Sequence, residues 1–299
     1  MNALADAAPA ASARRAEALA ARLPPLLVAA ERVAATVAQG VHGRRRVGSG
    51  DSFWQFRPFV TGDPISRIDW RQSAKSGRPD PHGWYLRETE WEAAQTVCLW
   101  QDVSASMRWH SAQGLVEKSA RAELLLLALA SLLLRGGERV TLLGAQMRPL
   151  AGGAGLERLA ETLATTVPDG PGLPPSVPIP RHAKVVLISD FLSPMPEIHA
   201  AISRLASVPV TAYLLQVLDP AEVELPYSGR IRFRGLERDG ETVVPRVENI
   251  RDAYAARLTA QQDGIRALCV AAGFGFSVHR TDHPPETALL SLYTALSAK

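Results

Sequence analysis

Asp102-Val103-Ser104-Ala105-Ser106-Met107 is the stretch of sequence that decides the fold. It follows a short apolar run, 96–100, and precedes a longer apolar run with helical spacing, 114–135. A buried strand therefore gives way to a loop here, and a helix begins shortly afterwards. The loop holds one carboxylate and two hydroxyls at alternate positions, and these are hard oxygen ligands of the kind that Mg²⁺ prefers.

The remainder of the chain alternates between strand and helix patterns. Such alternation is typical of a mainly parallel sheet with helices on both faces, so we predict a doubly wound α/β fold. A segment at 227–245, with Asp239-Gly240 as its turn, predicts a β-hairpin. The predicted strands are 96–100, 139–144, 184–190, 210–217 and 274–278, with a short edge strand at 147–150; the predicted helices are 114–135, 156–167, 194–207, 250–271 and 286–297.

A second aspartate, Asp190, ends the apolar run 184–190. In open α/β sheets, ligands bind beyond the carboxyl ends of the strands, near the point where the strand order reverses. If Asp102 and Asp190 both lie at that edge, they converge with Ser104 and Ser106 on one cation. The alternative is structural: the two serines cap the following helix, and Asp102 accepts hydrogen bonds from their amides.

The pattern Asp102-x-Ser104-x-Ser106, joined to Asp190, resembles the metal-ion-dependent adhesion site of von Willebrand factor A domains. The resemblance implies that these four residues hold Mg²⁺. It also implies that a carboxylate from a partner protein completes the coordination of the ion. The chemistry of such a site is binding and not turnover.

One ligand of that site has no direct counterpart in this chain. The von Willebrand class usually provides a threonine from the loop after the second helix. Thr165 and Thr166 fall in the predicted end of that helix, and the loop itself is dominated by proline. Ser176 and Asp169 are the available substitutes, so the resemblance leaves open whether the site retains its ion.

A further set of motifs precedes the first strand of the α/β pattern. In chain order they are Phe53, Phe56-Arg57, Gly62-Asp63-Pro64, Arg67-Ile68-Asp69-Trp70, Ser73-Ala74 and Arg87-Glu88. They resemble the signature of the domain of unknown function 58 family, with Pro58-Phe59 standing where Arg-Glu-Tyr is usual. The resemblance runs from about residue 40 to the C-terminus. It implies partnership with a MoxR-type AAA+ ATPase, in a chaperone-like or assembly role.

Asp69 and Trp70 belong to the most specific of these motifs. Asp69 has Arg67 and Arg71 close by in the sequence, so guanidinium partners are available to it locally. Ion pairs of this kind usually fix a loop. We therefore predict a structural role for Asp69, and we expect Trp70 to lie in a core or an interface.

The motifs divide the chain into two expected parts. Residues 1–94 form a family-specific N-terminal segment, and residues 95–299 form the von Willebrand A-like domain. Within the first part, 14–39 has apolar residues at helical spacing, interrupted by Pro24 and Pro25. We expect two helical pieces there, packed against the main domain.

Composition limits the class of protein further. Residues 42–90 contain nine Lys and Arg against six Asp and Glu, a surplus that equals the +3 of the whole chain. Arg44-Arg45-Arg46 is its densest part, which keeps nucleic-acid association as an alternative function, although aromatic-interleaved binding motifs are lacking. Cys98 and Cys269 lie in apolar runs and are expected to be reduced and buried. With no apolar stretch of the ~20 residues that a bilayer requires, we expect a cytoplasmic protein.

Catalytic functions have weaker support. A phosphatase of the haloacid dehalogenase type needs a second carboxylate two residues after its nucleophile, and Ser104 occupies that place. No Gly-x-Ser-x-Gly elbow and no Gly-Lys-Ser/Thr phosphate loop is present. His279 and His283 flank Asp282 in a proline-rich stretch, which predicts a surface turn and not a zinc site. We therefore predict a non-catalytic protein-interaction module; the alternative is a hydrolase or phosphatase that uses the cleft between the two strand-end aspartates.

Overall fold

The computed structural model consists of two compact units. One combines residues up to 43 with 96–299, and the other is 44–95. The structure describes residues 27–38, 53–61, 63, 65–78, 80–89, 95–145, 147–166, 170, 172–237 and 240–297. Predictions on Arg44 to Arg46, on Pro24 and Pro25, on Asp169 and on Asp239 lie outside the described residues.

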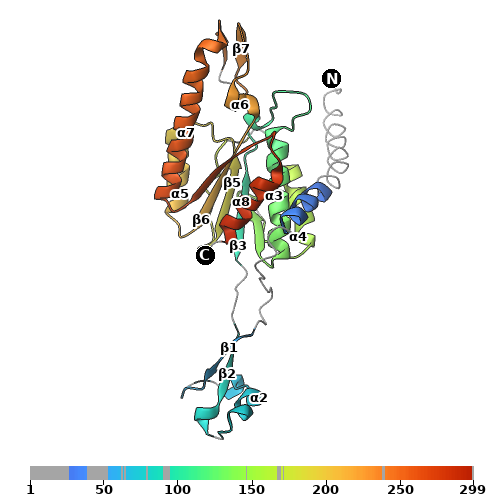
Figure 1. Ribbon diagram of the computed structural model, residues 1–299, viewed down its shortest axis with the longest axis vertical. Helices are drawn as coiled ribbons and strands as arrows, with labels where there is room; N and C mark the ends of the chain where they lie inside the picture. Colours follow the sequence, from blue (N-terminus) through green and yellow to red (C-terminus); the bar gives the residue numbers. More distant parts are fainter. Residues whose placement is uncertain are drawn as a thin grey trace, which may run out of the picture. The chain divides into compact units, whose positions relative to one another are not determined.

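The larger unit is built on a sheet of five parallel strands (Figure 1). In the sheet the order is β4-β3-β5-β6-β9, so the strand order reverses between β3 and β5. The prediction of a doubly wound, parallel α/β fold is confirmed. The strands are β3 (Thr96–Gln101), β4 (Arg139–Leu142), β5 (Lys184–Ser189), β6 (Thr211–Leu218) and β9 (Gly275–Arg280).

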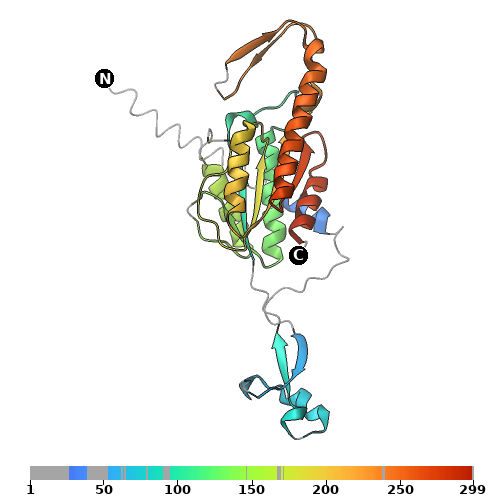
Figure 2. The same ribbon diagram turned by 90° about the vertical axis from the view of Figure 1, so that its left-hand side faces the viewer.

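Helices cover both faces of this sheet, as the two views show (Figures 1 and 2). Because neighbouring side chains of a strand point to opposite faces, Val97 and Leu99 of β3 enter one core, whereas Cys98 and Trp100 enter the other. The first core also contains α3 (Lys118–Arg135), α4 (Ala154–Thr165), α8 (Pro285–Ser297) and the helical residues 27–38. The second contains α5 (Met195–Ala206) and α7 (Arg251–Ala271).

The helical residues 27–38 belong with the α/β unit. Ala30, Val33, Ala34 and Val37 are buried in the first core, at the spacing of one helix face. The structure thus divides the expected 1–94 segment, because this helix joins the domain that begins at Thr96 and the stretch 44–95 forms its own unit.

Helix α3 is the central helix of the first core. Every residue from Leu125 to Leu134 is buried, and Gly137 follows in a left-handed conformation with φ 82° that ends the helix. Its first residue is Lys118 and not Gly114, which adopts φ 93° and turns the chain before the helix begins. Among the described residues, no helix is both long and apolar enough to cross a membrane.

The connection from β6 to β9 contains more than a crossover helix. A short helix, α6 (Pro220–Glu224), follows β6, and the sequence analysis did not predict it. Next come the antiparallel strands β7 (Ile231–Arg234) and β8 (Glu241–Val244), which confirm the predicted hairpin. A 3-10 turn, η5 (Val247–Ile250), leads into α7.

The smaller unit contains an antiparallel pair, β1 (Phe53–Pro58) and β2 (Tyr85–Thr89). Between them lie four short helical turns, η1 (Ile65–Arg67), α2 (Trp70–Ser73), η2 (Ala74–Ser76) and η3 (Pro81–Gly83). Asp69 caps α2, because its carboxylate accepts a hydrogen bond from the Gln72 amide at 2.9 Å. Trp70 is 56% exposed, so it does not lie in a core, and its place in an interface stays a prediction; its ring packs edge-on against Trp84, with centroids 5.5 Å apart.

Candidate functional site

Asp102 and Asp190 lie at the carboxyl ends of neighbouring parallel strands. Asp102 directly follows β3, and Asp190 directly follows β5. The Asp102 amide continues the ladder by donating to the Ile188 carbonyl at 2.9 Å. The sheet reverses its strand order between these two strands, which is where doubly wound folds bind their ligands.

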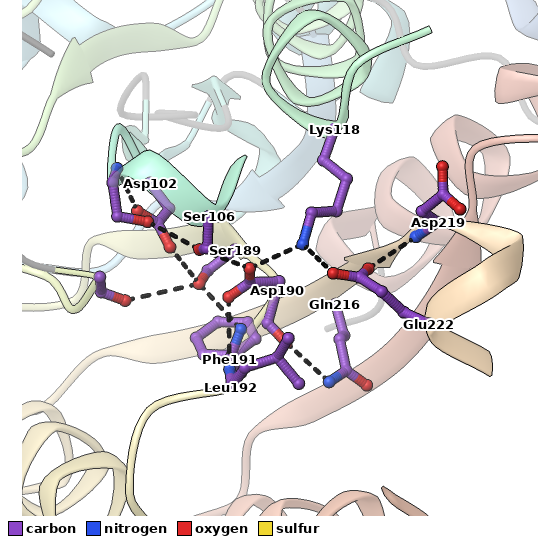
Figure 3. A network of polar contacts seen from close by, with 12 residues as sticks. Asp102, Ser106, Lys118, Ser189, Asp190, Phe191, Leu192, Gln216, Asp219 and Glu222 are labelled. Atoms are coloured by element: carbon purple, nitrogen blue, oxygen red, sulfur yellow. Dashed lines mark hydrogen bonds and ion pairs between the residues drawn. The ribbon is translucent and has the colours of Figure 1, made fainter. Parts of the chain in front are cut away.

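Asp102 is fully buried and holds two hydrogen bonds. One carboxylate oxygen accepts from the Ser104 amide at 2.8 Å, and the other accepts from the Ser189 hydroxyl at 2.6 Å (Figure 3). Burial raises the pKa of Asp102 above its usual value, and the nearby Asp190 adds to this effect, whereas the hydrogen bonds from Ser189 and Ser104 oppose it. A buried carboxylate in this position gains from a nearby cation.

The two predicted serines connect the aspartates. The hydroxyl oxygens of Ser104 and Ser106 lie 3.1 Å apart, and Ser106 Oγ donates to Asp190 Oδ2 at 2.7 Å. The structure therefore brings Asp102, Ser104, Ser106 and Asp190 into one hydrogen-bonded network.

The structural alternative for these serines holds in part. Ser104 precedes the 3-10 turn η4 (Ala105–Met107), but its side chain makes no capping hydrogen bond. Its hydroxyl instead lies against that of Ser106. The Ser104 amide does bond to Asp102, as that alternative expects, whereas the Ser106 amide lies 3.4 Å from Glu237 Oε1.

Lys118 completes the network, and the sequence analysis missed it. Its ammonium lies 2.8 Å from Asp190 Oδ2 and 2.5 Å from Glu222 Oε1, with no exposure of the lysine side chain to solvent (Figure 3). Burial alone would lower the pKa of Lys118, but the two carboxylates outweigh burial and raise it. The lysine is therefore a fixed internal cation.

Helix α6 brings two more carboxylates to this region. Glu222 accepts from the Asp219 amide at 2.8 Å while Asp219 accepts from the Ala221 amide at 2.8 Å, an arrangement known as a capping box. The second oxygen of Asp219 accepts from the Ser111 amide at 3.0 Å. Burial raises the pKa of Glu222, although Lys118 acts in the opposite direction.

The charges of this region do not balance. Among the described residues, the ammonium of Lys118 lies with four carboxylates, those of Asp102, Asp190, Asp219 and Glu222. The formal charge of these five groups is −3 when all are ionised. Buried charges are normally paired or bound to a metal. Within the described ranges, no three His, Cys, Asp or Glu side chains are grouped as a metal centre, so a cation here would depend on the serine hydroxyls.

Gly172 lies close to Asp102. A Cβ atom at this position would lie 3.3 Å from Ser193 Oγ, 3.5 Å from Asp102 Oδ2 and 3.8 Å from Ser104 Oγ, so a larger side chain would crowd the site. Its carbonyl also lies 3.4 Å from the Ser189 hydroxyl. The oxygen donors of Asp102, Ser104 and Ser106 are of the kind that a small, hard cation prefers.

Among the described residues, no hydrogen bond joins Thr165, Thr166 or the possible substitute Ser176 to the strand-end network. Thr165 and Thr166 donate their hydroxyls back to helix carbonyls, among them that of Thr162 at 3.0 Å in both cases. Ser176 lies on the surface in the loop that follows. Asp169 lies outside the described residues.

His279 is the buried residue of the edge strand β9, so the prediction of a surface turn is wrong for it. It lies in β9 and is 5% exposed, with Nε2 3.4 Å from a guanidinium nitrogen of Arg121. Arg121 also donates to the carbonyls of Thr281 and His283, at 2.8 Å each. Burial and the positive charge of Arg121 lower the pKa of His279 to about 4, so the ring is neutral.

The fold and the site together define a von Willebrand A-like α/β protein, with strand-end aspartates at the point where the sheet reverses. A family model described as "Protein of unknown function DUF58" matches residues 55–264. The chain belongs to this family.

Curated relatives extend the match. "Uncharacterized protein Rv1480" of Mycobacterium tuberculosis is 27% identical over 255 residues, which cover 79% of this chain and 76% of the relative. "Uncharacterized protein Mb1516" of Mycobacterium bovis matches with the same values.

Solved structures show a more distant similarity. An aerotolerance-related membrane protein from Bacteroides fragilis is 16% identical with a TM-score of 0.39, over 68% of this chain and 99% of that protein. BatB from Bacteroides thetaiotaomicron is 14% identical with a TM-score of 0.33, over 68% of this chain and 98% of its own.

Proposed function

We propose that this protein is a non-catalytic interaction module that binds partner proteins through a divalent cation of the Mg²⁺ type. Asp102, Ser104 and Ser106 would hold the ion, with Asp190 acting directly or through Ser106. The bound ion supplies a positive charge that attracts an acidic group of the partner. The chain's own residues orient the oxygen donors and exclude bulk water from Asp102.

The position of the Asp102 carboxylate is the observation that supports this proposal most directly. It is buried with one amide and one hydroxyl as its hydrogen-bond partners, and burial raises its pKa. The ammonium of Lys118 is engaged by Asp190 and Glu222 instead. A cation beside Asp102 would offset the energetic cost of burying this charge.

Lys118 also favours binding over phosphate chemistry. A lysine that assists phosphoryl transfer must reach the phosphate oxygens. Here its side chain is fully buried and held by two carboxylates. We therefore keep hydrolase or phosphatase activity as an outcome of the test.

The proposed class of partner protein follows from the family resemblance alone. Resemblance to the domain of unknown function 58 family implies a MoxR-type AAA+ ATPase as partner, in a chaperone-like or assembly role. The nucleic-acid alternative depends on Arg44 to Arg46, which lie outside the described residues.

Calorimetric titration of the full-length protein with Mg²⁺ or Mn²⁺ tests the cation. Asp102→Asn keeps the shape of the side chain but removes its charge, so we expect it to abolish binding. Gly172→Val crowds the site beside Asp102, and we expect affinity about tenfold lower, as is typical of changes next to a metal ligand. Asp80→Asn, an exposed change in the smaller unit, and Gly153→Val, where a Cβ meets nothing within 4 Å, are the matched controls. Equal binding by Asp102→Asn and the wild type would contradict the proposed site.

Co-precipitation with a purified MoxR-type ATPase tests the partner. We expect capture in Mg²⁺, loss of capture in EDTA and loss in Asp102→Asn, with the fold of the variant verified by circular dichroism. Hydrolysis of p-nitrophenyl phosphate by the wild type, absent from the same variant, would instead establish the enzyme alternative.

A further inference from the structure

The β7–β8 hairpin has two chemically different faces. Ile231 and Phe233 lie on one face and are half-buried, with the Phe233 ring centroid 5.9 Å from that of Tyr227. Because residues alternate along a strand, Arg232 and Arg234 lie on the opposite face. Their side chains are 70% and 80% exposed, so this face, here called the arginine face, is open to solvent.

The arginine face carries an excess of positive charge. Among the described residues, Glu241 is the acidic group that opposes its two guanidinium groups, at 3.9 Å from each. Both distances exceed that of a hydrogen bond, so one carboxylate is shared loosely between two cations. Val243, paired directly with Arg232, is 42% exposed and adds an apolar contact surface beside this arginine.

The hairpin reaches the rim of the strand-end site. Glu237, which follows β7, approaches the Ser106 amide to 3.4 Å although 131 residues separate the two. Figures 1 and 2 show the hairpin beyond the N-terminal end of α7, on the same side of the sheet as α6. The tip of the hairpin thus contacts the loop that holds Ser106.

We propose that the arginine face binds an acidic segment of a partner protein, one in which an apolar side chain lies between carboxylates. Guanidinium groups pair with carboxylates through two parallel hydrogen bonds, and arginine next to exposed apolar surface is typical of protein interfaces. A nucleic acid fits less well, because the arginine face offers two guanidinium groups and not a longer basic track along a phosphate backbone. This binding does not require the cation proposed above.

Fluorescence anisotropy with a short labelled peptide of glutamates around a central leucine tests the proposal. The full-length protein is titrated in EDTA at physiological ionic strength, so that cation binding plays no part. We expect Arg232→Gln/Arg234→Gln to weaken binding about tenfold, which corresponds to the loss of two solvent-exposed charge pairs. Arg232→Glu/Arg234→Glu should weaken it further.

A matched control distinguishes binding at the arginine face from the effect of net charge alone. Arg139→Glu/Arg158→Glu changes the net charge by the same amount as the second variant, at exposed positions on β4 and α4, and should retain the affinity of the wild type. Because the titration is made in EDTA, failure of the cation site and failure of the arginine face are distinguishable.

Three results would overturn the proposal. They are absence of peptide binding by the wild type, equal weakening by the Arg139→Glu/Arg158→Glu control, and unchanged affinity in Arg232→Gln/Arg234→Gln. Tighter binding of a single-stranded oligonucleotide of matched charge, lost in the same variant, would assign the face to nucleic acid instead.

Discussion

The Lys118 ammonium lies between the carboxylates of Asp190 and Glu222, and the lysine side chain has no exposure to solvent. Replacing it with methionine would leave two buried carboxylates without their cation. Removing one partner of a buried ion pair commonly costs roughly 3–5 kcal/mol. We therefore expect Lys118→Met to lower the free energy of unfolding, measured by urea denaturation in EDTA, by about that amount.

Two further variants make this prediction specific to the charge. Lys118→Met/Glu222→Gln removes one of the unpaired carboxylates and should regain part of the lost stability, a non-additive result. Lys75→Met, at an exposed position in the smaller unit, should behave as the wild type does. If Lys118→Met is as stable as the wild type, the ion pairs contribute nothing to folding.

His279 gives the molecule a pH-dependent stability. Burial and then Arg121 lower its pKa in the folded state to about 4, from an ordinary value of 6.5. The unfolded chain therefore binds a proton first as the pH falls, so the stabilisation is complete above 6.5 and is lost between 6.5 and about 4. The shift corresponds to roughly 3 kcal/mol.

His279→Gln removes the titrating group but keeps a neutral hydrogen-bonding side chain. We expect its melting temperature to fall less steeply between pH 6.5 and 4 than that of the wild type. His199→Gln, an exposed change on α5, should retain the wild-type pH profile. Parallel profiles for the wild type and His279→Gln would contradict this account.

At the scale of elements, the capping of its first turn by Asp219 stabilises the short helix α6. Asp219 is fully buried and accepts hydrogen bonds from the amides of Ala221 and Ser111. Asp219→Ala would leave both amides without this acceptor, so we expect a loss of about 2 kcal/mol in urea denaturation. Asp80→Ala is the control, because Asp80 is exposed and makes no capping bond. Equal stability of the two variants would show that α6 does not depend on its cap.

Sequence patterns predicted the long elements well and the short ones less well. The strands β3 and β5 and the helix α3 are each marked by a continuous apolar run whose length separates strand from helix. Helix α6 has five residues, which are too few to show a hydrophobic period. Its sequence nevertheless contains a capping-box motif, Asp219-Pro220-Ala221-Glu222, which predicts the start of a helix.

Part of the site could also be predicted from the sequence, because it lies at the ends of strands that the sequence predicts. Asp102 and Asp190 end neighbouring parallel strands, so their proximity follows from the topology. Lys118 was not foreseeable from spacing, because its two partners lie 72 and 104 residues further along the chain. One signal was present: a lysine at the first position of a helix opposes the helix dipole, which suggests that carboxylates hold it there.

At the scale of the whole α/β unit, the two cysteines report on the core between the sheet and helices α5 and α7. Cys98 and Cys269 are free thiols, each 1% exposed, and burial raises the pKa of each to about 11. Thiolate, the reactive form, is therefore scarce in the folded protein. We expect no reaction with Ellman's reagent at pH 8 in buffer, and reaction of both thiols in step with the unfolding seen by circular dichroism as urea is added. Rapid labelling of either thiol in the native protein would contradict this packing.

The placement of the β7–β8 hairpin has an evolutionary consequence. Among the described residues, none from 226 to 246 belongs to either hydrophobic core, and both ends of the hairpin are tied to the body of the domain through α6 and η5. The length and the charge of this segment can therefore change in evolution without a change in the strand order of the sheet. Evolution could rewrite some twenty residues there without replacing Asp102, Ser104, Ser106 or Asp190, and the contact of Glu237 with the Ser106 amide is the link that would change.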